Sequence, residues 1–338
     1  MKKNYLLLLL VLALMIAGCS TDNRNLMVEG KVNVITSFYP LYDFTVKIGG
    51  DYVNAINLVP AGVEPHDWTP KARDMVNITK SDVFIYNGAD FEGWVQDFLD
   101  TLDAADGPVV IAASAGVKLI DSAEHEHGDG HDEHDEHADE HDHGHAEEDD
   151  EHADEHEHAD DHEHGDFDPH VWLSPKQAML MAAAIRDALV EADPAHADAY
   201  HSNYDDLSSR LAELDAELTR IATNSTKKEF VVSHESFGYL ARDYGLVQVA
   251  VMGLSPDAEP TVRRMQEIKQ FVEEHDIQYI LFEELVSSKL AETLANSLNI
   301  KTMVLNPLEG LTEEQQRAGE DYISIMKSNL TTLEKALK

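Results

Sequence analysis

Short apolar runs alternate with longer amphipathic stretches in the part of the chain that begins at residue 31. The apolar runs are rich in β-branched residues and predict four strands, at Val32–Phe38, Ala55–Val59, Val83–Asn87 and Val109–Ala112. Apolar positions at helical spacing predict helices between them, over Lys71–Ser81 and Phe91–Leu102. This alternation is typical of a parallel sheet covered by helices, so we predict an N-terminal α/β lobe over residues 31–193.

The same pattern returns in the last third of the chain. Four more strands are predicted, at Glu229–Ser233, Val247–Met252, Tyr279–Phe282 and Thr302–Leu305. Helices are predicted at Phe237–Tyr244, Thr261–His275, Ser287–Leu298 and Thr312–Ala336. We therefore predict a second α/β lobe over residues 227–338, similar to the first and facing it across a cleft.

Two helical stretches lead from one lobe to the other. Ser174-Pro175 starts a helix that runs toward Glu191, and Pro194 starts a long charged stretch, from which we predict a linking helix over residues 194–226. The chain has 338 residues, and single hydrophobic cores stop growing at about 250–300 residues. Length and pattern together favour two parallel-sheet α/β lobes joined by a helix.

Residues 1–19 have the features of an export signal. Lys2 and Lys3 precede the apolar run Leu6–Ala17, and Ile16-Ala17-Gly18-Cys19 resembles a bacterial lipobox. That resemblance implies that Cys19 is lipidated and holds the protein at the outer side of the cytoplasmic membrane, with residues 20–30 as a flexible tether. Cys19 is the only cysteine, so a metal in the folded part must be held by imidazole and carboxylate.

Residues 124–166 contain 13 of the 19 histidines, among Asp, Glu, Gly and Ala. A segment with so few apolar residues cannot offset the entropy of ordering, and we predict a disordered loop. Much of the formal net charge of −40, from 65 acidic and 25 basic residues, falls in this segment. This charge repels phosphates and attracts cations, so we expect no nucleic acid partner.

Three histidines outside that segment stand at corners of the predicted fold. His66 follows a strand in Gly62–Trp68, His170 lies in Asp168–Leu173, and His234 directly follows the strand that ends at Ser233. Ligands of open α/β sheets bind beyond the carboxyl ends of strands, and neutral imidazoles bind zinc well. From position alone the three could converge on a metal or have separate structural roles, and we expect the other three, His196, His201 and His275, to be ordinary surface residues.

Several motifs, in order, resemble the solute-binding proteins of zinc and manganese ABC importers. They are Thr36–Pro40, Gly62–Trp68, Val83–Glu92, Asp168–Leu173, Ser233–Leu240 and Leu281–Glu284. The resemblance implies two α/β lobes joined by a long rigid helix, with a metal in the cleft bound by His66, His170 and His234. It also implies a lipid-anchored monomer that is not an enzyme and whose partner is an ABC permease.

The fourth ligand of that family is a carboxylate after the last strand, or solvent. Glu309 stands at the matching point, and Glu283 and Glu284 are alternatives because they too follow a strand. Three histidines and one glutamate favour zinc as the transported ligand, whereas manganese prefers more carboxylates. The histidine-rich segment resembles a loop of the zinc members, and we expect it to collect zinc weakly and pass it to the site.

Three alternative functions remain at this stage. Manganese could be the cargo instead of zinc, and copper or nickel could compete at such a site, because the affinity order alone does not select zinc. A zinc hydrolase could use Glu64 or Asp67 as a base, but the chain has no His-Glu-x-x-His, no Gly-x-Ser-x-Gly and no phosphate-binding loop. An extracellular adhesin is the third class, and no residue pattern points to a host partner.

Overall fold

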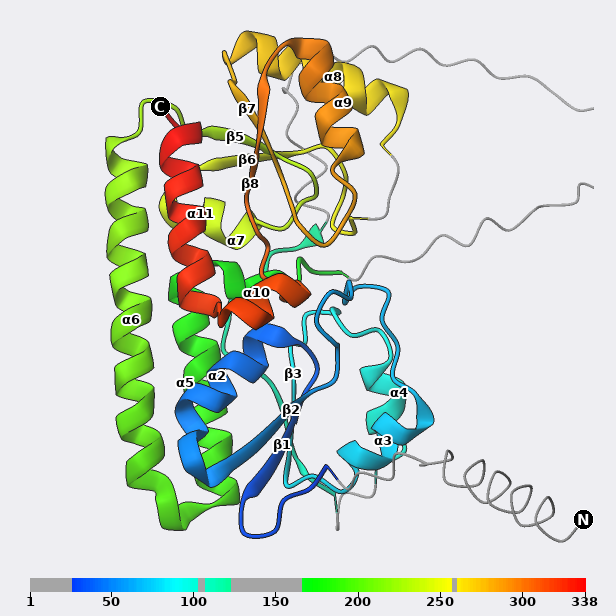
Figure 1. The fold of residues 1–338 in the computed structure, drawn as a ribbon, viewed down its shortest axis with the longest axis vertical. Coiled ribbons are helices and arrows are strands. Elements are labelled where there is room, and N and C mark those ends of the chain that lie inside the picture. The colour runs from blue at the N-terminus through cyan, green and yellow to red at the C-terminus, as the bar shows by residue number, and fades with distance from the viewer. Residues whose placement is uncertain (1–25, 103–106, 123–165, 257–259) are drawn as a thin grey trace, which may run out of the picture.

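The computed structural model describes residues 26–102, 107–122, 166–256 and 260–338, which form two lobes beside a long helix (Figure 1). The signal segment 1–19 with Cys19, most of the tether and the histidine-rich segment up to residue 165 lie outside the described residues. No helix in the described part is long and apolar enough to cross a membrane.

The N-terminal lobe is built on a four-stranded parallel sheet in the order β2-β1-β3-β4. The strands are β1 (Val32–Thr36), β2 (Val53–Asn57), β3 (Val83–Tyr86) and β4 (Val109–Ala112). Its helices are α2 (Tyr39–Gly49), α3 (Ala72–Ile78) and α4 (Val95–Leu99). The β1 side chains Val34 and Ile35 are fully buried on opposite faces, as expected for a central parallel strand covered on both sides.

The C-terminal lobe repeats this topology, with a parallel sheet in the order β6-β5-β7-β8. The strands are β5 (Glu229–Val232), β6 (Val247–Ala250), β7 (Tyr279–Phe282) and β8 (Lys301–Val304). The helices are α7 (Gly238–Tyr244), α8 (Val262–Glu274), α9 (Lys289–Leu298), α10 (Glu313–Ala318) and α11 (Tyr322–Ala336). The two parallel-sheet lobes expected from the sequence are therefore present.

Helices α5 (Pro175–Ala192) and α6 (Ala197–Asn224) connect the lobes. The 28 residues of α6 span about 42 Å at 1.5 Å per residue, and Figure 1 shows this helix running along both lobes. Leucines at helical spacing form its buried face: Leu207, Leu211, Leu214 and Leu218. Because α6 packs against α2, α5 and α11, one continuous element supports both sheets.

Two helical predictions differ from the structure. Helix α2 was not predicted, because its buried Leu41, Phe44 and Ile48 follow β1 so closely that the apolar run resembles a strand continuation. Pro40 in its first turn is compatible with a helix start, where the N–H has no intrahelical partner. The predicted helix Thr312–Ala336 is two helices, α10 and α11, because Gly319 adopts a left-handed conformation with φ 74° that ends the first.

Segment 168–173 is held between the lobes by three hydrogen bonds. Tyr239 Oη donates to the Asp168 carbonyl at 2.7 Å, and Tyr322 Oη donates to the Trp172 carbonyl at 2.6 Å. Trp172 Nε1 donates to the Pro307 carbonyl at 2.7 Å. These buried bonds attach the segment that carries His170 to the C-terminal lobe.

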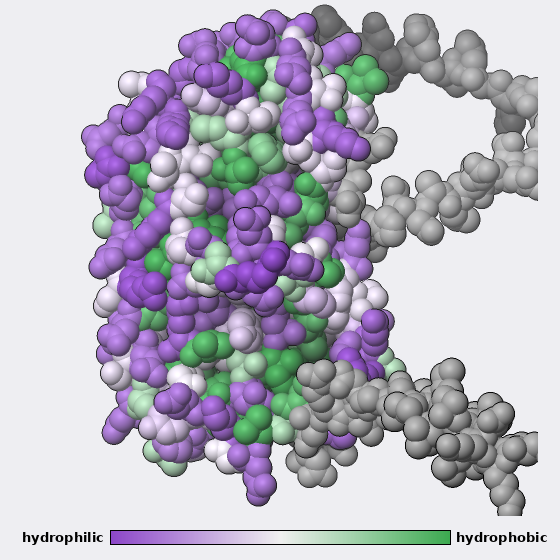
Figure 2. All heavy atoms as spheres, viewed as in Figure 1, coloured by the Kyte–Doolittle hydropathy of each residue, from purple (hydrophilic) through white to green (hydrophobic). Residues whose placement is uncertain are grey.

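The outer surface offers little apolar area on the face in view. Figure 2 shows hydrophilic residues over most of that face, with hydrophobic residues in small separate groups. Scattered exposed apolar residues such as Val46, Tyr52 and Val262 are normal for a protein surface.

Candidate metal centre

His66 lies in the loop that follows β2. Gly62 N–H donates to the Leu311 carbonyl at 2.8 Å, which ties this loop to the C-terminal lobe. Gly62 has φ 78°, a left-handed conformation that glycine adopts without strain. The backbone N–H of His66 donates to Glu64 Oε1 at 3.0 Å, and the His66 side chain is 12% exposed, the most open of the four candidate ligands.

His170 lies just before α5 and is completely buried. Asp168 Oδ1 accepts two hydrogen bonds from this residue, from the backbone N–H at 2.9 Å and from ring Nδ1 at 2.8 Å. Asn87 Nδ2, at the end of β3, donates to the Pro169 carbonyl at 2.9 Å. The backbone on each side of the imidazole is therefore fixed by buried partners.

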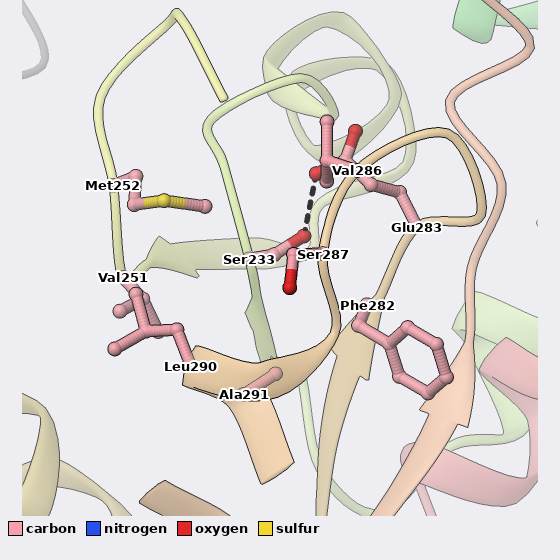
Figure 3. A pocket seen from close by; sticks show the side chains of 9 residues that line it. All are labelled: Ser233, Val251, Met252, Phe282, Glu283, Val286, Ser287, Leu290 and Ala291. Atoms are coloured by element: carbon pink, nitrogen blue, oxygen red, sulfur yellow. Dashed lines mark hydrogen bonds between the residues drawn. The ribbon is translucent and has the colours of Figure 1, made fainter. Parts of the chain in front are cut away.

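His234 follows β5 and is also buried. Its Nδ1 lies 2.7 Å from Glu283 Oε1, and Ser233 Oγ donates to the same oxygen at 2.8 Å. Figure 3 shows the Ser233–Glu283 bond at the edge of a small pocket with mostly apolar walls. Glu283, which follows β7, thus binds both Ser233 and His234 in the loop after the neighbouring strand β5.

Glu309 lies in the loop after β8, between the two lobes. Asn306 Oδ1 accepts from the Leu308 N–H at 2.7 Å, and Asn329 Nδ2 donates to the Asn306 carbonyl at 2.7 Å. Leu308 has φ 57°, an uncommon conformation for a non-glycine residue. These buried bonds stabilise the turn that directs Glu309 inward, where its side chain is fully buried.

The four candidate side chains converge on one point. Glu309 Oε1 lies 3.3 Å from His66 Nε2, 3.4 Å from His170 Nε2 and 3.2 Å from His234 Nε2. His170 Nε2 lies 3.2 Å from His66 Nε2 and 3.4 Å from His234 Nε2. Four donors bound to zinc in a tetrahedron with bonds of about 2.0–2.1 Å lie about 3.3–3.4 Å apart. Five of the six separations between the donors therefore fit tetrahedral zinc, and all four potential ligand atoms lie within 4.8 Å of one another.

Hydrogen bonding behind the rings fixes which nitrogen faces this point. Carboxylates accept, so Nδ1 of His170 and of His234 must donate to Asp168 and Glu283, which leaves Nε2 of each neutral ring as an acceptor. These acceptors face one another and the carboxylate of Glu309. Like partial charges at this distance repel, so the arrangement is favourable only with a cation or protons between them.

The pKa values follow from the same geometry. Burial lowers the pKa of His66. Burial also disfavours charged His234, but the carboxylates of Glu283 and Glu309 outweigh it and raise the pKa of His234 well above its ordinary value. Burial opposes ionisation of Glu309, whereas the imidazoles, His234 first, hold its pKa well below the usual range.

Residues 34–336 match the sequence profile of the family described as "Zinc-uptake complex component A periplasmic". This match covers most of the chain. The chain belongs to the zinc-uptake component A family. In this family member, the described residues bring three imidazoles and one carboxylate together as a candidate metal site.

Relatives of this family support the assignment. The chain is 40% identical over 333 residues to the zinc-binding lipoprotein AdcA of Streptococcus pneumoniae. The matched region covers 98% of this chain but 60% of AdcA. It thus spans less than two thirds of that relative's length. It is 39% identical over 327 residues to the high-affinity zinc uptake system protein ZnuA of Bacillus subtilis, with 96% and 94% covered.

A solved structure of the family has the same fold. The Zn(II)-bound ZnuA-like domain of Streptococcus pneumoniae AdcA superposes with a TM-score of 0.72 at 37% identity. The similarity covers 91% of this chain and 99% of that domain. The two-lobe architecture with a connecting helix is therefore the architecture of the zinc-uptake component A family.

The two alternative carboxylates, Glu283 and Glu284, lie outside the cluster of potential ligands in the described residues. Glu283 lies behind His234, where it accepts from Nδ1. Glu284 accepts from Asn306 Nδ2 at 2.6 Å and from Gln315 Nε2, so it holds the loop that carries Glu309. Among the described residues, Glu309 is the carboxylate that joins the three histidines as a group whose potential ligand atoms lie within 4.8 Å of one another.

The other described histidines lie away from the site. His196 stacks on Tyr52 and its Nδ1 bonds Asp193 at 2.6 Å. His275 stacks on Phe271, and His201 is exposed on α6. None of the three belongs to the cluster of potential metal ligands among the described residues, in line with their expected surface role.

Sequence reasoning did not assign a role to Asp168 or to Asn87. Asp168 stands two residues before His170, a spacing that lets one carboxylate reach both the backbone N–H and the ring of the histidine. That spacing is a readable signal. Asn87 is 82 residues from Pro169, and only the fold brings the two together.

Proposed function

We propose that this chain captures Zn²⁺ outside the cytoplasmic membrane and delivers it to an ABC permease, without changing the metal chemically. The observation that carries the proposal is the meeting of three Nε2 atoms and one carboxylate oxygen, with separations of 3.2–3.4 Å. His66, His170, His234 and Glu309 are the ligands. The names of AdcA and ZnuA, which describe zinc binding and zinc uptake, support zinc as the cargo.

The donor set argues against the alternatives. Manganese is a harder cation and is better served by oxygen ligands, whereas this site has three imidazoles. Hydrolytic zinc sites keep a position open for water, whereas three imidazoles and one carboxylate supply the four protein donors of a closed coordination shell. Binding and release, rather than turnover, is the function that this site supports.

The proposal extends to the organisation of the whole chain. Cys19 carries the lipid anchor, residues 20–30 form the tether, and the lobes span residues 31–193 and 227–338 with the linking helix at 194–226. The protein works as a monomer. The histidine-rich segment within residues 124–166 collects zinc at high local concentration and supplies the site.

The ends of that segment allow a clean test. Ser122 N–H donates to the Asp166 carbonyl at 2.9 Å, and Asp121 forms an antiparallel bridge with Phe167. Because these ends lie side by side, residues 124–165 can be replaced by a short glycine linker. The Asp168 N–H bond to the Ile120 carbonyl, at 2.9 Å, continues to hold the segment beside His170.

Competitive titration of zinc and manganese into the chain with and without this segment tests the function. We expect one tight zinc site in both proteins, manganese that does not displace zinc, and loss of only the weak sites on deletion. Loss of tight zinc binding on deletion would place the principal ligands in the segment instead. Preference for manganese would contradict zinc as the cargo.

A further inference from the structure

Carboxylates stand behind two of the three imidazoles. Asp168 accepts from His170 Nδ1 at 2.8 Å, and Glu283 accepts from His234 Nδ1 at 2.7 Å. Within the described residues, no carboxylate stands behind Nδ1 of His66, whose Nε2 faces Glu309. Each lobe therefore contributes one imidazole that is held from the side opposite the candidate metal.

Burying the Glu283 carboxylate costs free energy. It is 2% exposed, and its surroundings include the apolar side chains Val251, Phe282 and Leu290 (Figure 3). Burial of a carboxylate costs several kcal/mol unless hydrogen bonds compensate it. Its Oε1 accepts from Ser233 Oγ and His234 Nδ1, while its Oε2 has no hydrogen-bond partner among the described residues. The imidazole is thus its principal partner.

The position of Glu283 decides what His234 can do. With Nδ1 donating to this carboxylate, the ring presents the Nε2 lone pair to the point shared with Glu309. A ring rotated by half a turn would present carbon instead of Nε2. A partner behind a histidine ligand fixes its tautomer and orientation and makes the ligating nitrogen more basic.

We propose that Glu283 is a positioning residue for the metal, which selects the Nδ1–H tautomer of His234 and directs Nε2 toward the ion. The proposal rests on the proposed function, because His234 must be a ligand for its orientation to matter. Glu283 does not touch the metal itself. Its low-dielectric surroundings strengthen the hydrogen bond that transmits its effect.

Two substitutions separate the parts of this role. Glu283→Gln keeps an oxygen that accepts from Nδ1 but removes the charge, and Glu283→Ala removes the acceptor. We expect zinc affinity to fall about tenfold in E283Q and about 100-fold in E283A, the range found for partners behind histidine ligands. Chelator competition on the full chain measures these affinities.

Ser233→Ala is the matched control. It removes the other donor to the same carboxylate oxygen and leaves the imidazole bond in place. We expect a smaller loss of zinc affinity than in E283Q, because the bond between Glu283 and the imidazole remains. Thermal melting of each metal-free variant shows whether it is folded, and only folded variants enter the comparison.

A spectroscopic measurement distinguishes positioning from simple stabilisation. In ¹⁵N NMR of the metal-free chain, at a pH where His234 is neutral, the unmodified protein and E283Q should show Nδ1 protonated and Nε2 unprotonated. E283A should lose this preference. Rescue of the tautomer in E283Q together with intermediate affinity is the expected signature.

The proposal is overturned if E283A binds zinc as tightly as the unmodified protein, or if His234 carries its proton on Nε2 in the unmodified chain. Failure of the proposed function looks different. In that case the unmodified chain itself binds no zinc tightly, while the tautomer measurement, made without metal, still reports whether Glu283 orients His234.

Discussion

The two lobes share a topology and also a buried serine–glutamate pair, but they use the pair differently. Ser37 directly follows β1 and donates to Glu92, which follows β3. Ser233 directly follows β5 and donates to Glu283, which follows β7. Since β1 and β5 hold equivalent places in the two sheets, as do β3 and β7, the two serines occupy corresponding positions and each glutamate follows the corresponding strand, Glu283 directly and Glu92 in a longer loop.

The partners of the two glutamates differ. Glu92 Oε1 also accepts from the Asn87 N–H at 2.7 Å, and its Oε2 accepts from the Gly88 N–H at 3.2 Å, so it closes the turn after β3. Glu283 accepts from an imidazole instead. The residue after the serine explains this, since it is Phe38 in one lobe and His234 in the other. The serine–glutamate pair therefore stabilises a backbone turn in one lobe and a proposed metal ligand in the other, depending on whether the residue after the serine is Phe38 or His234.

The largest effect on zinc affinity is expected when His234 is replaced by phenylalanine, the residue at the equivalent place in the N-terminal lobe. His234→Phe removes one of the four proposed ligands and should weaken zinc binding by more than about 100-fold, beyond the effect of losing a partner behind a ligand. It also leaves Glu283 with Ser233 as its one remaining partner among the described residues. Chelator competition measures the affinity.

His275→Ala is the control for loss of an imidazole. His275 is exposed beside Phe271, far from the cluster of ligands. Zinc affinity should be unchanged. Equal loss of affinity in both variants would show that the histidines act through overall charge or stability and not through the proposed site.

The N-terminal pair should affect stability more than zinc binding. Glu92→Ala leaves the buried N–H groups of Asn87 and Gly88 without their acceptor, and each unsatisfied group costs about 1–3 kcal/mol. We expect the free energy of unfolding to fall by about 2–4 kcal/mol. Chemical denaturation of the metal-free chain measures it. A variant of normal stability that has lost zinc affinity would contradict the assigned difference between the pairs.

The sign of a pH effect on stability follows from the same carboxyl group. Burial raises the pKa of Glu92 from 4.5 to about 7, although its hydrogen bonds act in the opposite direction. The folded protein therefore holds this proton more tightly than the unfolded chain, so its contribution to stability is complete below pH 4.5 and is lost as the pH rises toward 7. The difference in unfolding free energy between the unmodified protein and Glu92→Gln should change over this window. A constant difference would contradict the raised pKa.

Zinc affinity should depend on pH in the opposite direction. Zinc must displace a proton from His234, whose pKa is raised by Glu283 and Glu309 against the effect of burial, whereas burial lowers the pKa of His66. Affinity should therefore fall by about tenfold per pH unit, for each displaced proton, once the pH is below the pKa of His234. Calorimetry in buffers of different ionisation enthalpy counts the protons. In Glu283→Gln this fall should begin at a lower pH, and an unchanged profile would contradict the role of that carboxylate.

The sequence predicted much of this arrangement because its signals are local. Short β-branched runs between helices locate all eight strands to within a few residues, and loops rich in proline mark His66 and His170. Local sequence could not decide which of Glu283, Glu284 and Glu309 joins the histidines, since all three follow a strand. It depends on the left-handed turn at Leu308 and on Asn329 from α11, neither of which has a signature in the sequence.

The smallest effect is expected for the difference in unfolding free energy between alanine substitutions of the two serines. Ser37→Ala leaves Glu92 with two backbone donors, whereas Ser233→Ala leaves Glu283 with His234 as its one remaining donor among the described residues. A net hydrogen bond contributes about 0.5–1.5 kcal/mol, and bonds to charged groups contribute more. We expect Ser233→Ala to lower the unfolding free energy of the metal-free chain more than Ser37→Ala, by about 1 kcal/mol. Parallel denaturation curves measure this, and a larger loss for Ser37→Ala would mean that the backbone donors do not compensate Glu92, so that the two pairs are equivalent after all.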